Sequence, residues 1–318
     1  MTKFYEITPL DTLFFRGSTP MEAGQYNTES LFPPPVSVMK GALWTALCQK
    51  KGKSFDDGLT AEGKIPFEIT GFYIKKNTKT YAPAPATWYY DSDEKAKNGK
   101  ECSGKKLCVA LSKTRAFKKL GMKSSAKDVV FVVPKEDAKS LVGCWINVDF
   151  IRHPKDQFPE DSVLFPSDIF SKESRTGVAL DSNRMAKDGQ LYTSTHIRLH
   201  DDVSFVISVA GEVDFGEGKM LLGGERRLVS YKNASEISFA DSSNSSLYLS
   251  LVPVEATEDN LSKLVSSAKI FVTSGWSLKQ GFHKPSVSWI PAGAVFNGEI
   301  NDKIKQSCIP LENKKGDE

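Results

Sequence analysis

Alternation of apolar and polar residues with a period of two begins near Gly189 and favours a strand-rich fold for the second half of the chain. Successive side chains of a β-strand point to opposite faces, so a strand with one buried face shows this period. The apolar positions of two expected strands are Val203, Phe205, Ile207 and Val209, followed by Leu247, Leu249 and Leu251. Ahead of a third strand at residues 269–273, Thr257 is expected to cap a helix whose inner face is Leu261, Leu264, Val265 and Ala268.

The first half opens with a similar succession of strand, helix and strand. Residues 4–10 and 67–74 are expected to form strands rich in aromatic and β-branched residues. Between them, Phe32-Pro33-Pro34-Pro35 precedes apolar residues at three-to-four spacing, which predicts a helix from Val36 to about Gly52. Two halves that each contain strand, helix and strand indicate an α+β fold with two ferredoxin-like (RRM-like) domains carrying long insertions, residues 1–188 and 189–318.

Positive charge is concentrated in one part of the chain. The formal net charge is only +3, from 42 Lys or Arg against 39 Asp or Glu, in 318 residues. Apolar and charged fractions of 40% and 25% are those of a globular protein and exclude a disordered or fibrous one. Residues 75–127, however, hold fourteen Lys or Arg and four Asp or Glu. We interpret this block as a basic insertion in the first domain, either a solvated loop or a surface for phosphates.

Apolar runs and cysteines bear on where the chain resides. No apolar run approaches the roughly 18 residues of a membrane helix, and the residues after Met1 lack the apolar core of a secretory signal, so a cytoplasmic location is expected. The five cysteines are scattered and form no C-x-x-C pair, which favours reduced and mostly buried thiols: Cys48, Cys102, Cys108, Cys144 and Cys308. Metal binding by Cys102 and Cys108 is the weaker alternative.

Standard catalytic and nucleotide-binding motifs are absent from the sequence. There is no P-loop, no G-x-S-x-G and no H-E-x-x-H, and Gly216-Glu217-Gly218 lacks the third glycine of a dinucleotide fingerprint. Asp181-Ser182-Asn183 begins like a calcium loop, but the residues that follow do not supply its remaining ligands and glycine. No catalytic residue, cofactor or metal site is therefore expected.

Residues 191–200 combine strand alternation with aromatic and basic residues on one face. That face is expected to carry Tyr192, Ser194, His196, Arg198 and His200. In a strand the two histidines stand about 13 Å apart, too far to share a metal ion. Such a stripe suits single-stranded RNA, whose bases stack on rings and whose phosphates pair with arginine, although an ordinary solvent-facing strand has the same pattern.

Glycine-rich turns next to basic residues recur three times in the second half. Leu222-Gly223-Gly224-Glu225-Arg226-Arg227 combines a backbone that can approach a ligand closely with two guanidinium groups, one of which Glu225 can orient. Similar segments occupy residues 274–285 and 290–294. A glycine pair is more often a hairpin turn than a site, but the three segments together indicate a phosphate-binding groove.

Several segments of the chain, taken in order, resemble one family. They are Leu10-Asp11-Thr12-Leu13-Phe14-Phe15-Arg16, Phe32-Pro33-Pro34-Pro35 with Lys40-Gly41-Ala42-Leu43, Gly177-Val178-Ala179-Leu180-Asp181 leading to Gly189-Gln190-Leu191-Tyr192, Gly223-Gly224-Glu225-Arg226-Arg227, Gly275-Trp276 and Pro291-Ala292-Gly293. The chain is similar to the third subunits of the Cmr complex, RAMP-superfamily proteins of the type III-B CRISPR effector. The likeness extends from residue 10 to about 296 and leaves the lysine-rich insertion without a counterpart.

The resemblance implies two ferredoxin-like domains and a non-catalytic role in antiviral defence. Such a subunit grips the 5′ tag of the CRISPR RNA beside the large polymerase-like Cmr subunit, caps the filament of repeated backbone Cmr subunits and meets target RNA only indirectly. Phosphates would then pair with Arg16, Lys40, Arg198, Arg226, Arg227 and Lys284. The tag would also be contacted by Tyr192, His196, Trp276 and Phe282, with His283 in the same segment.

Two other functions stay open on the sequence alone. Some RAMP relatives cut repeat RNA without metal, and His196 beside Tyr192 has the residue types of a base that deprotonates the 2′-hydroxyl. The chain would then be a metal-independent endoribonuclease that processes CRISPR repeat RNA. Alternatively, it is a structural subunit whose affinity lies in protein contacts, with little grip on RNA.

Overall fold

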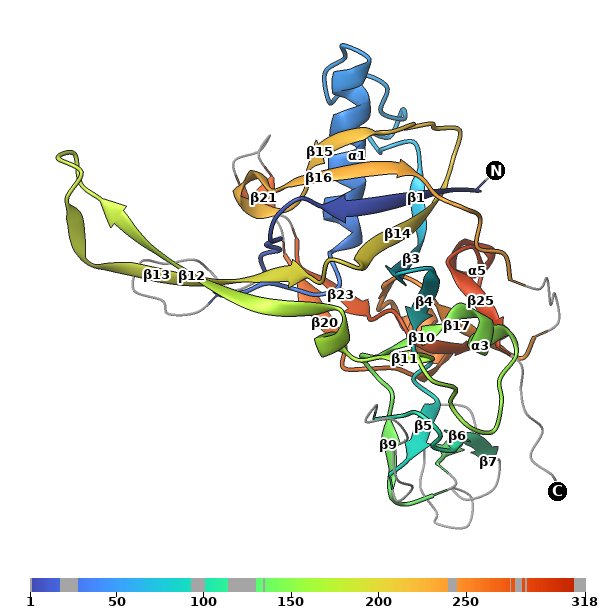
Figure 1. Cartoon of the computed structure of the whole chain (residues 1–318). Coiled ribbons are helices and arrows are strands. Elements are labelled where there is room, and N and C mark those ends of the chain that lie inside the picture. Colours follow the sequence, from blue (N-terminus) through green and yellow to red (C-terminus); the bar gives the residue numbers. More distant parts are fainter. Residues whose placement is uncertain are drawn as a thin grey trace. The chain divides into compact units, whose positions relative to one another are not determined.

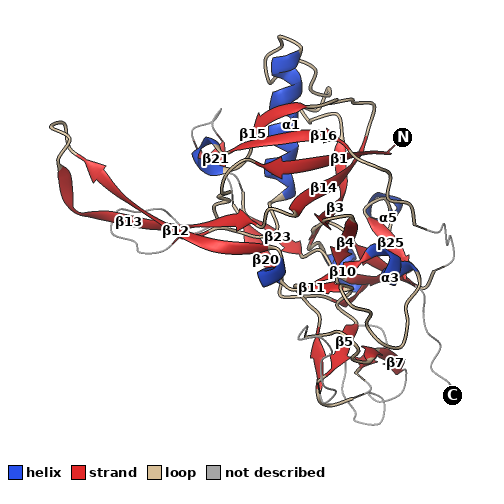
Figure 2. Ribbon diagram, viewed as in Figure 1, coloured by secondary structure: helices blue, strands red, loops and turns tan. Residues whose placement is uncertain are grey.

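Strands make up most of the regular structure, and the few helices are mostly short, in a mixed α+β fold (Figure 2). The computed structural model describes residues 2–17, 28–92, 101–113, 130–133, 135–239, 245–274, 276–277, 282–283 and 285–311. The chain divides into two compact units: Met1–Ile69, Ser167–Glu236 and Val272–Ser286 form the first, and Thr70–Pro166, Ile237–Phe271 and Val287–Glu318 form the second. The expected division into residues 1–188 and 189–318 does not coincide with these units, because β13 (Ala186–Leu199) runs through that position.

The first unit contains a sheet with the strand order β14-β1-β16-β15. β1 pairs antiparallel with both β14 and β16, so β1 and the strand that follows α1 are not hydrogen-bonded neighbours. The unit's elements are β1 (Thr2–Pro9), β2 (Thr28–Glu29), α1 (Val36–Lys50), β12 (Phe170–Leu180), β13, β14 (Val203–Ala210), β15 (Gly218–Leu221), the 3₁₀ turn η2 (Gly224–Arg226), β16 (Leu228–Asn233), β21 (Trp276–Ser277) and β22 (Phe282–His283).

The long helix α1 forms where the three-to-four spacing of apolar residues predicts it. The chain enters α1 from Pro35, whose backbone is extended (φ −59°, ψ 129°). The helix packs against the sheet beside β15 (Figure 1). It buries Met39, Leu43, Trp44, Ala46, Leu47 and Cys48. Each large apolar side chain buried in this way contributes about 1.5–3 kcal/mol, so the helix is stabilised by its packing on the sheet.

β12 and β13 form a long two-stranded ribbon, drawn in yellow-green (Figure 1). Near its base, β2 adds to β13 as a parallel strand at Ser194 and Thr195. At its tip, one Asp181 carboxylate oxygen accepts hydrogen bonds from the backbone N–H groups of Asn183 and Met185, both at 2.8 Å. The Asp-Ser-Asn sequence that begins like a calcium loop is thus the turn of a β-hairpin.

The second unit is built from several small sheets. The strand orders within it are β11-β10-β4-β3, β19-β24-β17-β25, β6-β5-β9 and β7-β8. Its elements are β4 (Lys79–Pro83), β5 (Trp88–Asp91), β6 (Leu107–Val109), β7 (Leu111–Lys113), β8 (Val130–Val132), β9 (Ala138–Ser140), β10 (Trp145–Asn147), α3 (Val148–Arg152), β11 (Val163–Leu164), β17 (Leu247–Ser250), β18 (Val254–Glu255), α4 (Glu258–Ser262), β19 (Leu264–Ser266), β23 (Val287–Ile290), β24 (Val295–Asn297), α5 (Asp302–Lys305) and β25 (Cys308–Leu311). β3 (Glu68–Lys76), the 3₁₀ turn η1 (Pro166–Asp168) and β20 (Phe271–Thr273) contain residues of both units.

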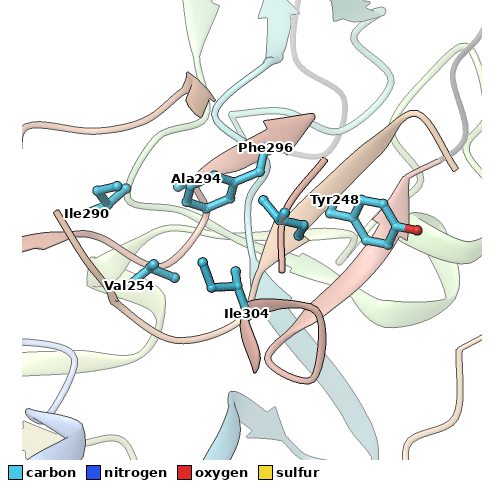
Figure 3. Packing of buried hydrophobic residues seen from close by; sticks show 7 residues of the cluster. Tyr248, Val254, Ile290, Ala294, Phe296 and Ile304 are labelled. Atoms are coloured by element: carbon cyan, nitrogen blue, oxygen red, sulfur yellow. The ribbon is translucent and has the colours of Figure 1, made fainter. Parts of the chain in front are cut away.

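One hydrophobic core of the second unit lies between its strands and α5. Side chains from β17, β18, β23 and β24 converge there with Ile304 of α5 (Figure 3). The cluster consists of Tyr248, Val254, Ile290, Ala294, Phe296, Ile300 and Ile304. The alternation at residues 247–251 is therefore the signature of a strand that contributes to this core.

The helix expected after Thr257 is shorter than predicted. Thr257 is its N-cap, with the side chain accepting a hydrogen bond from the Asn260 N–H at 3.3 Å. The helix ends at Ser262, because Leu264 already belongs to β19 and pairs with Phe296 of β24. Sheet pairing here overrides the helical spacing of the apolar residues.

Part of the basic block is a folded core rather than a loop. Residues 81–88 are all buried, in β4, in β5 and between them. Lys105 is also buried, with its ammonium 5.0 Å from the centroid of the Tyr90 ring. Residues 93–100 and 114–127 of the block lie outside the described residues.

The expectations for cysteines and membrane segments can be compared with the described residues. All five cysteines are free thiols, and four of them are buried, whereas Cys308 is half-buried. Within the described ranges, no helix has the length and apolar character needed to cross a bilayer.

Candidate nucleic-acid interface

Residues 11–16 place charged side chains at the surface of the first unit. The segment is bound to β13 by two backbone hydrogen bonds between Leu13 and Ile197, at 2.7 and 2.9 Å. Residues 12–15 are buried, whereas Asp11 and Arg16 at the two ends are exposed. The buried residues thus fix the position from which the Asp11 carboxylate reaches the surface.

Three arginines from separate parts of the sequence meet at Asp11. The Asp11 Oδ1 atom lies 3.5 Å from Nη2 of Arg175 and 3.3 Å from Nη2 of Arg198, and its Oδ2 atom lies 2.9 Å from Nη1 of Arg227. The hydrogen bond from the Thr12 N–H, together with the three guanidinium groups, holds the pKa of the Asp11 carboxyl below its usual range. Asp11 is therefore an anion that forms ion pairs with three cations.

Two further carboxylates complete what we call the arginine network: Asp11, Glu173, Arg175, Arg198, Glu225 and Arg227. Glu173 lies 2.9 Å from Nη2 of Arg175 and 2.6 Å from Nε of Arg198, and these hydrogen bonds lower its pKa. Glu225 pairs with Arg227. Three guanidinium groups are thus matched by three carboxylates, and the network has no formal net charge.

His196 lies beneath this network and has no exposed surface in the chain. Its ring stacks on Phe14, with the centroids 4.9 Å apart and the planes at 19°. The Nδ1 atom lies 3.2 Å from the Thr12 hydroxyl, and Nε2 lies 3.2 Å from the Ser194 hydroxyl and 3.4 Å from Glu225. Burial lowers the pKa of His196 and so disfavours the protonated ring, although the Glu225 carboxylate opposes the shift.

The expectation of an open aromatic and basic stripe is therefore wrong at its centre. Ser194 and His196 are buried, and Thr12, Phe14 and Glu225 contact the His196 ring, whereas Arg198 further along the strand is exposed. The alternation identified the strand, but it did not reveal that another segment covers the middle of its polar face. His196, predicted to contact RNA, has no exposed surface in this chain and packs beneath the arginine network.

The glycine pair before Arg227 serves close packing within the protein. Gly223 has φ +79°, and a Cβ atom on it would lie 2.5 Å from the Phe14 carbonyl oxygen. The Gly224 N–H donates a hydrogen bond of 2.7 Å to the same oxygen. The backbone of the glycine pair, predicted to approach a ligand closely, thus approaches Phe14 of the same chain. Arg226, at the end of the turn, is exposed.

The remaining predicted residues do not all join the network. The Nζ atom of Lys40, on α1, lies 2.7 Å from Oε1 of Glu68, on β3. The Tyr192 ring covers Gly177, its partner across the ribbon, where an added Cβ would lie 2.3 Å from the ring. The predicted residues Trp276, Phe282 and His283 lie on the β21–β22 hairpin, where Trp276 pairs with His283 along the backbone. Lys284 lies outside the described residues.

The structure adds residues that sequence reasoning assigned no role. Asp11 was part of a recognised segment, yet its contacts with arginines up to 216 residues away have no local signal. Arg175 and Glu173 lie on β12, where Glu173 pairs directly with His196 across the ribbon. The role expected for Glu225, orienting one guanidinium of the glycine-rich turn, is confirmed by its pair with Arg227.

Comparison with known proteins identifies first the architecture and then the family. The fold is similar to two chains from cryo-EM structures of the type III-B Cmr-beta complex bound to cognate target RNA, one with AMPPnP. The TM-scores are 0.55 and 0.54, the identity is 18% in both, and each match covers 95% of this chain and 91% of the other. The model of the CRISPR-associated protein family Cas_Cmr3 matches residues 5–258. The chain belongs to this family, and no curated protein matches it.

Proposed function

We propose that the chain is a non-catalytic, RNA-binding subunit of a type III-B CRISPR (Cmr) effector that anchors the 5′ tag of the CRISPR RNA. In that role it caps the filament of backbone subunits next to the large subunit, in the cytoplasm. Membership of the Cas_Cmr3 family supports the assignment to the effector. The single observation that carries RNA binding is the convergence of three arginines on Asp11 at the surface of one unit.

The arginine network suits a phosphate because its guanidinium groups retain unused donors. Each guanidinium has five N–H groups in a planar fork. Arg198 uses its Nε and one Nη2 contact within the network, and its side chain is 47% exposed. Salt bridges to Glu173 and Asp11 fix the side chain, so less conformational entropy is lost when a phosphate adds to it.

The endoribonuclease alternative has less support. A general base must come within about 3 Å of the hydroxyl it deprotonates. The His196 ring has no exposed surface, and both of its nitrogen atoms lie within 3.4 Å of protein oxygen atoms.

The salt dependence of RNA binding by the assembled effector tests this proposal. Arg198→Ala is expected to reduce the slope of log K against log salt concentration by about 0.7, the value for one single-strand phosphate contact. Lys263→Ala is the control, because Lys263 forms an exposed ion pair with Asp259 in the other unit. If the double variant with Arg198→Ala and Arg227→Ala shows an unchanged salt slope, the phosphate contact is contradicted. That result would favour a subunit that binds mainly through protein contacts.

A further inference from the structure

Three exposed leucines lie side by side on the first unit. Leu221 of β15 and Leu228 of β16 are direct cross-strand partners, and the Leu10 N–H donates a hydrogen bond of 3.1 Å to the Leu228 carbonyl. Their exposed fractions are 54% for Leu10, 52% for Leu221 and 38% for Leu228. We call these residues the leucine cluster. Contiguous exposed apolar side chains on a folded protein mark interaction surfaces more often than isolated ones do.

The leucine cluster lies beside a sheet edge. β15 is the last strand in the order β14-β1-β16-β15, and in the part of the chain that the structure describes no further strand pairs with it. Met220 points to the buried side with α1, whereas Lys219 and Leu221 are exposed. Side chains two residues apart share one face of a strand, so a lysine and a leucine stand next to each other on this face of the edge strand.

We propose that β15 accepts an extended segment of a partner protein as an additional strand, with an apolar residue on the leucine cluster and an acidic residue two positions away against Lys219. Strand addition gains affinity from main-chain hydrogen bonds and specificity from alternate side chains. The leucines supply the apolar contact, and Lys219 supplies the charge that selects an acidic neighbour. The partner is thus a polypeptide with alternating apolar and acidic residues.

A polypeptide fits this surface better than RNA or a second copy of the chain. Bases stack on aromatic rings, and the cluster consists of aliphatic side chains. Consider two copies of the chain whose β15 strands pair antiparallel. If Glu217 of one copy lies opposite Lys219 of the other, then Phe215 lies opposite Leu221. The Phe215 side chain is buried in its own copy, so it cannot contact Leu221. An antiparallel pair of two β15 strands with Glu217 opposite Lys219 therefore leaves the leucine cluster without an exposed apolar partner.

Photocrosslinking in the assembled effector tests the proposal directly. A benzophenone amino acid replaces Leu221 in the full chain, and the crosslinked peptide is identified by mass spectrometry. We expect a peptide of another protein that carries apolar and acidic residues at alternate positions. Crosslinks to RNA, crosslinks to a second copy of this chain, or the absence of any crosslink would each overturn the proposal.

Charge variants provide the second measurement. Leu221→Asp is expected to weaken retention of the crosslinked partner about tenfold, the loss that corresponds to one buried leucine contact. Lys219→Glu should also weaken it, and a lysine in place of the partner's acidic residue should restore it. Leu261→Asp is the matched control, because Leu261 is 40% exposed on α4 in the other unit. Unchanged retention in Leu221→Asp would overturn the proposal, while thermal melting of the free variants shows that each still folds.

Discussion

The Asp11 carboxylate lies 2.9 Å from the guanidinium of Arg227, although 216 residues separate the two in the sequence. Arg227 comes directly after a glycine-rich turn, and Asp11 comes directly before a buried segment. Both are positioned by Phe14, whose carbonyl oxygen accepts the Gly224 N–H. The surface network therefore depends on how closely the turn approaches residues 14 and 15.

Gly223→Ala should destabilise the first unit strongly. The new Cβ would lie 2.5 Å from the Phe14 carbonyl oxygen, and Gly223 has φ +79° with extended ψ, a conformation that is nearly exclusive to glycine. We expect a loss of about 3 kcal/mol or more in the free energy of unfolding, measured by denaturant titration. Gly216→Ala is the control, since its Cβ would meet only the end of the Lys50 side chain and should cost about 1 kcal/mol. Equal losses in the two variants would contradict the packing argument.

Asp11→Asn should change the selectivity of RNA binding. The substitution removes one carboxylate that competes with phosphate for three guanidinium groups, and it also removes the anion that positions them. We expect unrelated single-stranded RNA to bind with a salt slope larger by about 0.7, and the preference for tag RNA to fall. Competition binding by the assembled effector measures both quantities. Asp259→Asn, which affects the ion pair with Lys263, should leave the preference unchanged.

The buried His196 should make stability dependent on pH. Its pKa in the fold is below the unfolded value of about 6.5, mainly because of burial, so the unfolded chain binds a proton more readily. The stabilisation is therefore complete above pH 7 and is lost as the pH falls from about 6.5 towards the folded pKa. One proton sets an upper limit of about 1.4 kcal/mol per pH unit on the slope within that window. Denaturant titrations at pH 5 to 7.5 should show this slope in the native chain and a smaller one in His196→Gln.

The groups that face His196 bear on the size of this effect. Glu225 favours the protonated ring, whereas Arg227 and Arg175 oppose it. Glu225→Gln should therefore lower the pKa of His196 further and extend the window of pH-dependent stability towards acid.

The endoribonuclease alternative predicts that incubation of the protein with repeat RNA in EDTA yields cleavage, and that His196→Ala abolishes this cleavage. We expect intact RNA from both proteins.

The ribbon should show coupling between Gly177 and Tyr192. A methyl group at residue 177 would lie 2.3 Å from the Tyr192 ring, so Gly177→Ala must displace that ring. We expect Gly177→Ala to destabilise the ribbon when Tyr192 is present and to have little effect when residue 192 is alanine. Hydrogen exchange of the β12 and β13 amides in the two backgrounds measures this difference. Equal effects would show that the ring does not occupy the space above Gly177.

Local patterns predicted the elements of the fold better than they predicted its surfaces. The apolar spacing after Pro35 indicated α1, and alternation indicated β13, β14 and β17, because these signals arise within a single element. The length of the helix after Thr257 was overestimated, because Leu264 pairs with Phe296 of β24 instead of continuing the helix. The arginine network could not be predicted, since its members come from four separate segments. His196 was misplaced because periodicity does not tell whether another segment covers a face.

For the proposed RNA-binding role, the pairing of each cation in the arginine network with an anion has a consequence for how a guide strand arrives. A surface with balanced charge exerts little pull on a polyanion beyond the Debye length of about 8 Å at physiological salt. A nucleic acid must therefore come within about 8 Å of the network before its phosphates can compete with the carboxylates for the guanidinium groups. Unrelated RNA would therefore dissociate quickly from the network. Stable binding would require an RNA end that neighbouring subunits already hold next to the arginines.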